Sequence, residues 1–232
     1  MHRKRRVVVV ILSLLLFGFV VAINSEEPID TSLSTSGAEV LSESYSERAT
    51  EALETIAIKG RAPKTDYSRE QFGNGWGKIN GCDTRNIILN RDLRDVRLNE
   101  ETCHILEGIL DDPYTGKMIY FNRGSNSEVV QIDHVVALSD AWQKGATQLN
   151  KPERVAFAND PLNLLAVEGA ANQQKGDADA ASWLPPNKNF RCQYVARQIA
   201  VKSRYSLWMT PAEHEAISSV LQKCPEQLLP SK

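Results

Sequence analysis

The segment from Val130 to Val136 constrains the fold of this chain more than any other stretch of its sequence. It is rich in β-branched residues, as strands are, and it carries Asp133 and His134 side by side near its end. Two asparagines, a lysine and a glycine follow at spacings that extend this pair into a longer pattern. Written out, the pattern is D-H … N-L … N-x-x-K-G, formed by Asp133, His134, Asn163, Leu164, Asn172, Lys175 and Gly176.

The Asp-His pair is expected at the end of a β-hairpin. Lys117–Phe121 and Val129–His134 have the composition of strands, and the segment 122–127 between them is a polar turn. The residues Thr210–Glu213 combine a helix N-cap, a proline at the first helical position and a capping-box acid, so they predict a last helix running to about Lys223. Further helices are expected over 49–58, from about 84, over 138–149, over 152–158, around 170–172 and over 191–208.

Charge is distributed unevenly along the 232 residues, although the formal net charge is only −2. Residues 1–25 carry four bases and no acids, residues 26–58 carry one base and eight acids, and residues 59–232 carry 22 bases and 21 acids. A near-neutral body excludes a strongly basic protein that coats DNA, but a local basic patch still permits a nucleic-acid partner. The length allows one domain with a substantial core.

The first 25 residues are typical of an export signal. A basic stretch at residues 3–6 precedes an almost wholly apolar run over residues 7–23, so we expect either a cleaved signal peptide or an uncleaved signal anchor. Residues 26–58 are acidic and rich in Ser and Thr, as flexible linkers are. The expected organisation is therefore an export segment at 1–25, a linker at 26–58 and a folded domain at 59–232, which lies outside the cytoplasm.

The four cysteines of an exported chain are expected to form disulfides. Three pairings are open, and we favour Cys82–Cys103 with Cys192–Cys224, because each pair closes a local loop. A zinc site is the rival interpretation, but it lacks a C-x-x-C pair and has only His104 next to a cysteine.

The D-H … N-L … N-x-x-K-G pattern resembles that of the HNH (His-Me finger) endonucleases. The segments G-C-D-T-R-N, D-P-Y-T-G and D-P-L-N-L resemble those of secreted bacterial members, and the resemblance covers residues 75–225. It implies an α+β fold with a ββα-metal core, surrounded by additional helices and disulfide-braced loops. The third position is asparagine, where some members have histidine.

The resemblance also implies a role for each residue of the pattern. His134 is the expected general base, Asp133 and Asn172 are the expected metal ligands, and Asn163 holds the catalytic loop. Oxygen ligands suit a hard divalent ion, so we expect Mg²⁺, with Mn²⁺ as the alternative. Lys175 and Arg85 are candidates for phosphate contacts, each weighed against a purely structural role.

The function expected from this resemblance is metal-dependent hydrolysis of phosphodiester bonds by an extracytoplasmic endonuclease. DNA is favoured over RNA as the substrate, the protein is expected to be a monomer, and membrane contact is expected only through an uncleaved N-terminal segment. Two alternatives belong to other classes: an inactive module that binds nucleic acid or the cell envelope, and a metal-dependent hydrolase of another phosphoester.

Overall fold

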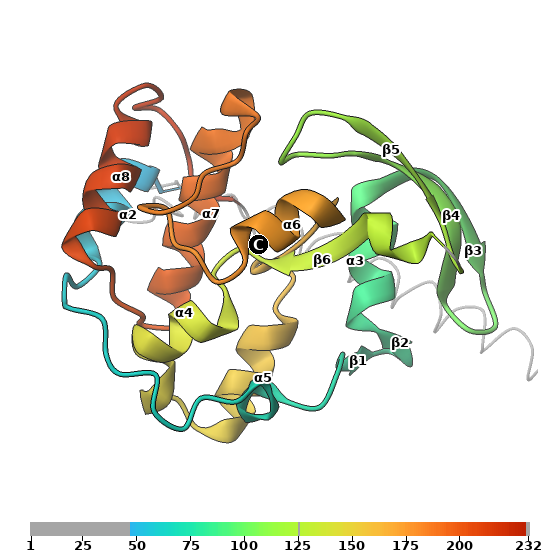
Figure 1. The fold of residues 1–232 in the computed structure, drawn as a ribbon, viewed down its shortest axis with the longest axis horizontal. Helices are drawn as coiled ribbons and strands as arrows, with labels where there is room; N and C mark the ends of the chain where they lie inside the picture. Colours follow the sequence, from blue (N-terminus) through green and yellow to red (C-terminus); the bar gives the residue numbers. More distant parts are fainter. Residues whose placement is uncertain (1–46, 125, 231–232) are drawn as a thin grey trace, which may run out of the picture. The chain divides into compact units, whose positions relative to one another are not determined.

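The computed structural model describes residues 47–124 and 126–230, so the export segment and most of the acidic linker lie outside the described residues. Within these ranges helices and strands are mixed, as expected for an α+β fold (Figure 1). The strands are β1 (Lys78–Ile79), β2 (Cys82–Asp83), β3 (Leu93–Asn99), β4 (His104–Asp111), β5 (Met118–Asn122), β6 (Val130–His134) and β7 (Leu164–Glu168). The α-helices are α2 (Ala49–Thr55), α3 (Thr84–Asp92), α4 (Leu138–Gln143), α5 (Lys151–Asn159), α6 (Gly169–Lys175), α7 (Arg191–Arg204) and α8 (Pro211–Leu221).

The helices occur where the sequence predicts them, although several are shorter. The last helix begins as predicted, because the Thr210 side chain accepts a hydrogen bond from the Glu213 backbone N–H at 3.2 Å. The segment 138–149 contains α4 and a separate 3₁₀ turn at Ala146–Gln148 in place of one helix. No helix in the described ranges is both long and apolar enough to cross a membrane.

The predicted hairpin between residues 117 and 134 is wrong. The strand β5 pairs with β4 in the antiparallel sheet β3-β4-β5, whereas β6 pairs with β7 in a separate antiparallel sheet. The strand β7 was not predicted. Its residues lie directly before a predicted helix and show no alternation of apolar and polar residues.

Burial explains this choice of partners. The strand β6 is almost wholly buried, so it needs a partner that is apolar at consecutive positions. Leu164–Val167 of β7 meet this need, because all four are buried. The strand β5 has only one buried residue, Phe121, and it forms the outer strand of its sheet.

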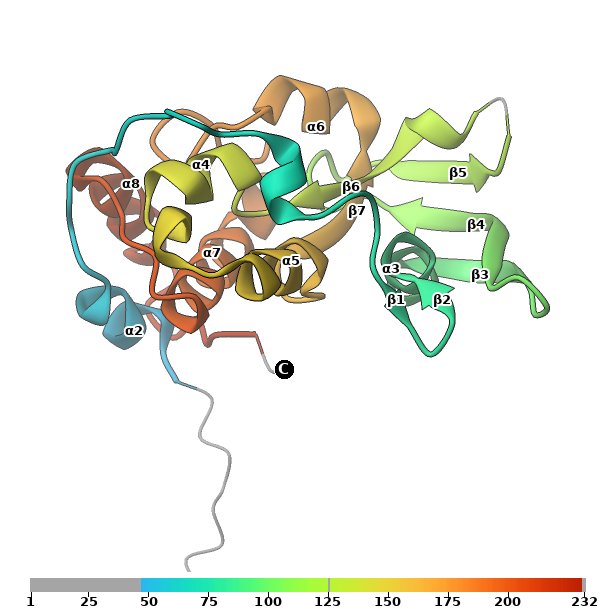
Figure 2. The ribbon, with the colours of Figure 1, turned by 90° about the horizontal axis from the view of Figure 1, so that it is seen from below.

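The helical part is built around α7, whose apolar face is covered by α2 and α8 (Figures 1 and 2). Ala49, Ala52 and Leu53 of α2 are buried in this core. The linker predicted for residues 26–58 therefore ends too late, because the folded domain already includes α2. The apolar spacing in this helix outweighs the acidic composition around it.

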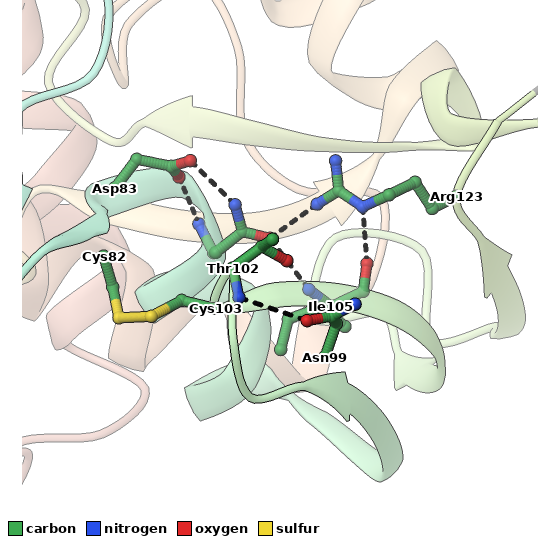
Figure 3. Close-up of a disulfide and its surroundings, with 8 residues drawn as sticks. Cys82, Asp83, Asn99, Thr102, Cys103, Ile105 and Arg123 are labelled. Atoms are coloured by element: carbon green, nitrogen blue, oxygen red, sulfur yellow. Dashed lines mark hydrogen bonds between the residues drawn. A yellow bond between two sulfur atoms is a disulfide. The ribbon is translucent and has the colours of Figure 1, made fainter.

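Two disulfides stabilise the domain in the predicted pairing, Cys82–Cys103 and Cys192–Cys224. They use all four cysteines, so the alternative zinc site is excluded. Near the first disulfide, Asp83 caps α3 by accepting hydrogen bonds from both the backbone and the side-chain nitrogen of Asn86 (Figure 3). The Asn86 Oδ1 atom in turn accepts from the backbone N–H of Ile105 at 2.9 Å, which connects α3 to β4.

A buried ionic cluster joins the helices to the segment that runs from Ala57 to Gly77. This segment, here called the strap, passes α4 in Figure 2. The Lys144 Nζ atom lies 2.7 Å from Asp179 Oδ2 and 2.6 Å from Glu213 Oε2. Burial lowers the pKa of Lys144, but Asp140 and Glu213 outweigh that effect, so the pKa is raised and the ammonium stays charged. The members of the cluster are Arg61, Asp140, Lys144, Asp179, Lys202 and Glu213.

Replacing Lys144 with methionine is expected to destabilise the fold by about 3–5 kcal/mol, because three buried carboxylates would then share two cations. Chemical denaturation measures this loss. Arg97→Ala is the matched control, since Arg97 forms an exposed ion pair with Glu107 and its removal should leave the melting temperature nearly unchanged. Equal stability of the Lys144→Met variant and the unaltered protein would contradict a structural role for the cluster.

Candidate active site

His134 lies at the end of β6, where two adjoining pockets meet. One pocket, of about 290 Å³, is lined by strap residues that include Phe72 and Trp76. The other, of about 380 Å³, is lined by Asp133 and Asn172. The histidine therefore faces the same open region as both predicted metal ligands.

The orientation of the His134 ring is fixed by a helix end. Its Nε2 atom lies 2.9 Å from the carbonyl oxygen of Ala158, in the last turn of α5, where carbonyls lack intrahelical partners. A carbonyl oxygen can only accept a hydrogen bond, so Nε2 carries the proton. In the neutral ring the lone pair is therefore on Nδ1. The Trp76 ring stacks on the imidazole with an interplanar angle of 10° and holds it from one side.

Burial keeps this imidazole neutral. It lowers the pKa of His134 to about 3, and the charges of Arg69 and Lys175 act in the same direction, against the raising effect of the Ala158 hydrogen bond. At neutral pH the ring is therefore an unprotonated base. This is the state required for accepting a proton from water.

Asp133 is the second residue of the pair, and it is held by two buried groups. The Lys175 Nζ atom donates to Oδ1 at 2.9 Å, and the Tyr114 hydroxyl donates to Oδ2 at 2.5 Å. Burial raises the pKa of Asp133, while Lys175 and Tyr114 oppose the shift. Each carboxylate oxygen has two lone pairs, so the carboxylate can still accept from a further partner.

Asn163 joins the two strands just beyond their last pair. Its Oδ1 atom accepts from the Val136 backbone N–H at 2.8 Å, and its Nδ2 atom donates to the Val136 carbonyl at 3.2 Å. The Val135 N–H also donates to the Asn163 carbonyl at 2.8 Å. The side chain is fully buried, so these contacts fix the loop that follows His134.

Asn172 is placed by the close packing of α6 against the β6 strand. The helix begins at Gly169, where an added Cβ atom would lie 2.3 Å from the carbonyl oxygen of Glu128, so only glycine allows this approach. The Asn172 Nδ2 atom donates to Gln131 Oε1 at 2.9 Å, which leaves its Oδ1 as the end that can accept. Gly176 ends the helix with a φ of 55°, which explains the glycine of the sequence pattern.

The structure places both candidates for phosphate contacts, Lys175 and Arg85, against internal acceptors. The Lys175 side chain is completely buried between Asp133 and the His134 carbonyl. Arg85 turns inward and donates to the Val130 carbonyl at 3.2 Å, and burial lowers its pKa. The sequence does not reveal that these cations satisfy internal acceptors, because both contacts are made by residues more than 40 positions apart.

The oxygen donors around the second pocket fit a weakly held hard cation. No group of three or more His, Cys, Asp or Glu side chains suited to a metal exists among the residues that the structure describes. Asp133 and Asn172 line one pocket and offer a carboxylate and an amide oxygen. Such a sparse set suits Mg²⁺, which keeps several waters and uses one or two carboxylates. The charge of Lys175 beside Asp133 further weakens the attraction for a cation.

The strap contributes site residues that the sequence pattern did not reveal. Trp76 stacks on His134, and Arg69 lines both pockets beside it. Both precede the D-H pair by more than 50 positions. The aromatic and Gly-rich composition of residues 67–76 indicates a packed loop but does not assign its residues to the site.

The Asp-His pair at the end of β6, Asn163 and Asn172 are the residues on which the resemblance to HNH-type proteins rests. Comparison with known families makes this more specific. Residues 83–220 match the family described as GmrSD restriction endonucleases, C-terminal domain. The match covers more than half of the chain, and the chain therefore belongs to this family. It is also 38% identical over 175 residues to an uncharacterized secreted protein of Arthroderma benhamiae, covering 74% of this chain and 82% of that protein.

The buried neutral His134 predicts a specific loss of stability in acid. The folded pKa of about 3 lies below the ordinary value of 6.5, so the unfolded chain binds the proton first as the pH falls. The stabilisation is complete above pH 6.5 and declines toward pH 3, at up to about 1.4 kcal/mol per pH unit.

The His134→Gln variant should lack this part of the pH dependence, because glutamine does not titrate. Denaturant unfolding of both proteins in EDTA, at several pH values from 7.5 to 4.5, measures the difference. Parallel stability profiles for the two proteins would show that the pKa of His134 is the same in the folded and unfolded chains, which would contradict a pKa lowered by burial.

The two asparagines should differ in their effect on stability. Asn163→Ala leaves buried backbone groups of Val136 without partners, so it should lower the free energy of unfolding by about 1–3 kcal/mol. Asn172→Ala removes one half-buried hydrogen bond and should cost less stability, but it should raise the metal concentration required for activity. Thermal melts with and without added metal separate these effects. A similar change in metal affinity for both variants would contradict the division of roles.

Proposed function

We propose that this protein is an extracytoplasmic, metal-dependent HNH endonuclease that hydrolyses phosphodiester bonds, with DNA preferred over RNA. The observation that carries the proposal is the orientation of the His134 ring. Its Nε2 atom is hydrogen-bonded to the Ala158 carbonyl oxygen, so its Nδ1 lone pair can accept a proton. His134 lines one pocket together with Asp133 and Asn172. Membership in a restriction endonuclease family supports the same chemistry.

His134 would accept a proton at Nδ1 from the water that attacks the phosphorus atom. The Ala158 carbonyl would continue to hold the Nε2 proton, so the ring keeps its orientation as it becomes charged. The neighbouring Trp76 ring restricts rotation, which fixes the direction of the lone pair. A base held in one tautomer and one orientation accounts for rate enhancements of about 10²–10⁴-fold.

Asp133 and Asn172 would hold a divalent ion, with Mg²⁺ expected and Mn²⁺ as the alternative. When bound, such an ion stabilises the charge that develops on the phosphate and on the leaving 3′-oxygen. Tyr114 and Lys175 act through Asp133, because they fix the direction of its carboxylate. Asn163 acts on the loop after His134 and has no contact with the reacting atoms in this scheme.

An extracytoplasmic location is supported by three features. The relative from Arthroderma benhamiae is named a secreted protein. The chain carries two disulfides, which persist in oxidising compartments. Its first 25 residues have the composition of an export signal, whether cleaved or retained as an anchor.

Incubation of the purified protein with supercoiled plasmid and Mg²⁺, Mn²⁺, Ca²⁺ or EDTA tests this function. Cleavage is expected with Mg²⁺ or Mn²⁺ and not with EDTA. The His134→Ala variant should lose about 10²–10⁴-fold in rate while still binding DNA and melting cooperatively. Arg97→Ala, on the distant sheet, is the control for the loss of a surface side chain.

Three outcomes would contradict the proposal. A folded His134→Ala protein that cleaves within about threefold of the unaltered rate would remove the histidine from the chemistry, given the usual size of general-base effects. Binding without cleavage under any metal condition would favour an inactive nucleic-acid module. Hydrolysis of a phosphate monoester, with plasmid left intact, would favour another phosphoesterase.

A further inference from the structure

The strap passes beside the candidate active site and lies outside the region matched to the family, residues 83–220 (Figure 2). It contains the 3₁₀ turn Arg69–Phe72, which places Arg69 at the junction of the two pockets. The site residues that the strap contributes therefore lie outside the region of this chain that matches the family.

The strap is held to the domain at several points along its length. Arg61 enters the buried ionic cluster, 2.9 Å from Asp179 Oδ2. The Trp142 Nε1 atom donates to the Thr65 carbonyl at 3.0 Å, and the Arg154 Nε atom donates to the Gln71 carbonyl at 3.0 Å. The turn that carries Arg69 is therefore attached on both sides, and its backbone is positioned before any substrate binds.

The Arg69 side chain is free to bind a ligand. Arg69 is exposed, and within residues 47–124 and 126–230 its guanidinium group has no hydrogen-bond or ion-pair partner. Arg69 lines the same two pockets as His134. A free guanidinium close to the proposed base can donate two parallel hydrogen bonds to a phosphate.

The other cations near the two pockets are already engaged. Lys64 donates to Asp177 Oδ2 at 3.3 Å and lies over the Tyr67 ring. Lys175 is buried against Asp133. Among the described residues that line the two pockets, Arg69 is thus the cation without an internal partner.

We propose that Arg69 binds a non-bridging oxygen of the scissile phosphate and is a further catalytic residue of this enzyme. The ligand is a phosphodiester within a polynucleotide, since pockets of about 290 and 380 Å³ flank Arg69 and give the chain room on both sides of the phosphate. Arg69 and His134 line both pockets, so a phosphate held by the guanidinium lies within reach of the base. This assignment rests on the proposed nuclease function.

Comparison of Arg69→Ala and Arg69→Lys with the unaltered protein tests the assignment. Loss of a charge-assisted hydrogen bond should lower kcat/KM for a DNA oligonucleotide by about 10- to 100-fold in Arg69→Ala. Arg69→Lys should recover part of the loss. Guanidinium chloride at low millimolar concentration should restore activity to Arg69→Ala but not raise that of the unaltered protein. Arg97→Ala, which removes an exposed arginine from β3, should retain full activity.

A binding measurement separates this inference from the proposed function. Fluorescence anisotropy with the same oligonucleotide in EDTA reports binding without any reaction. Weaker DNA binding by Arg69→Ala in EDTA would support the contact between Arg69 and the phosphate. If no metal ion then yields cleavage, the proposed nuclease function fails while this contact stands. Unchanged binding and cleavage by a folded Arg69→Ala protein would overturn the contact while the nuclease function stands. If Arg69→Ala loses activity, is not rescued by guanidinium and melts at a lower temperature, Arg69 has a structural role. This result would also overturn the proposed phosphate contact.

Discussion

The buried ionic cluster is the constraint on which the arrangement of the site depends. Lys144 and Lys202 are completely buried and are neutralised by acids from α4, α8 and the loop after α6. Desolvated charges are tolerated only with close partners, so the elements that supply them must come together in one arrangement. Arg61 extends the cluster to the strap, and Asp179 extends it to the end of α6. The same set of ion pairs therefore holds together the strap and the end of α6, which both line the second pocket beside His134.

Asp133 illustrates a second use of buried charge, within the site. Lys175 neutralises it from α6, and Tyr114 holds its other oxygen from the loop between β4 and β5. This places the carboxylate precisely, but it also lowers the net negative charge available to a cation. The proposed metal site thus combines firm positioning with weak affinity, which agrees with the sparse donor set around it.

Local features of the chain were predictable, whereas distant pairing was not. The start of α8 follows from Thr210 and Glu213, which are three residues apart, and each predicted disulfide closes a short loop. The pairing of β6 with β7 spans a helical insertion, so the sequence favoured the nearer partner β5. Burial of Lys175 depends on contacts across 42 positions and was not visible in the pattern. The strap residues were missed for the same reason.

The electrostatics of the cleft reconcile a near-neutral domain with an anionic substrate. In the pocket beside Asn172, the acids Asp133 and Asp177 each have a lysine partner, Lys175 and Lys64. These pairs cancel at short range, so the carboxylates repel an approaching phosphate far less than unpaired acids would. Arg69, which has no ion-pair partner among the described residues, adds a positive charge where both pockets meet, and the acid Glu70 also lines the first pocket. In the proposed function, Arg69 therefore offers a polyanionic substrate a cation at the junction of the two pockets.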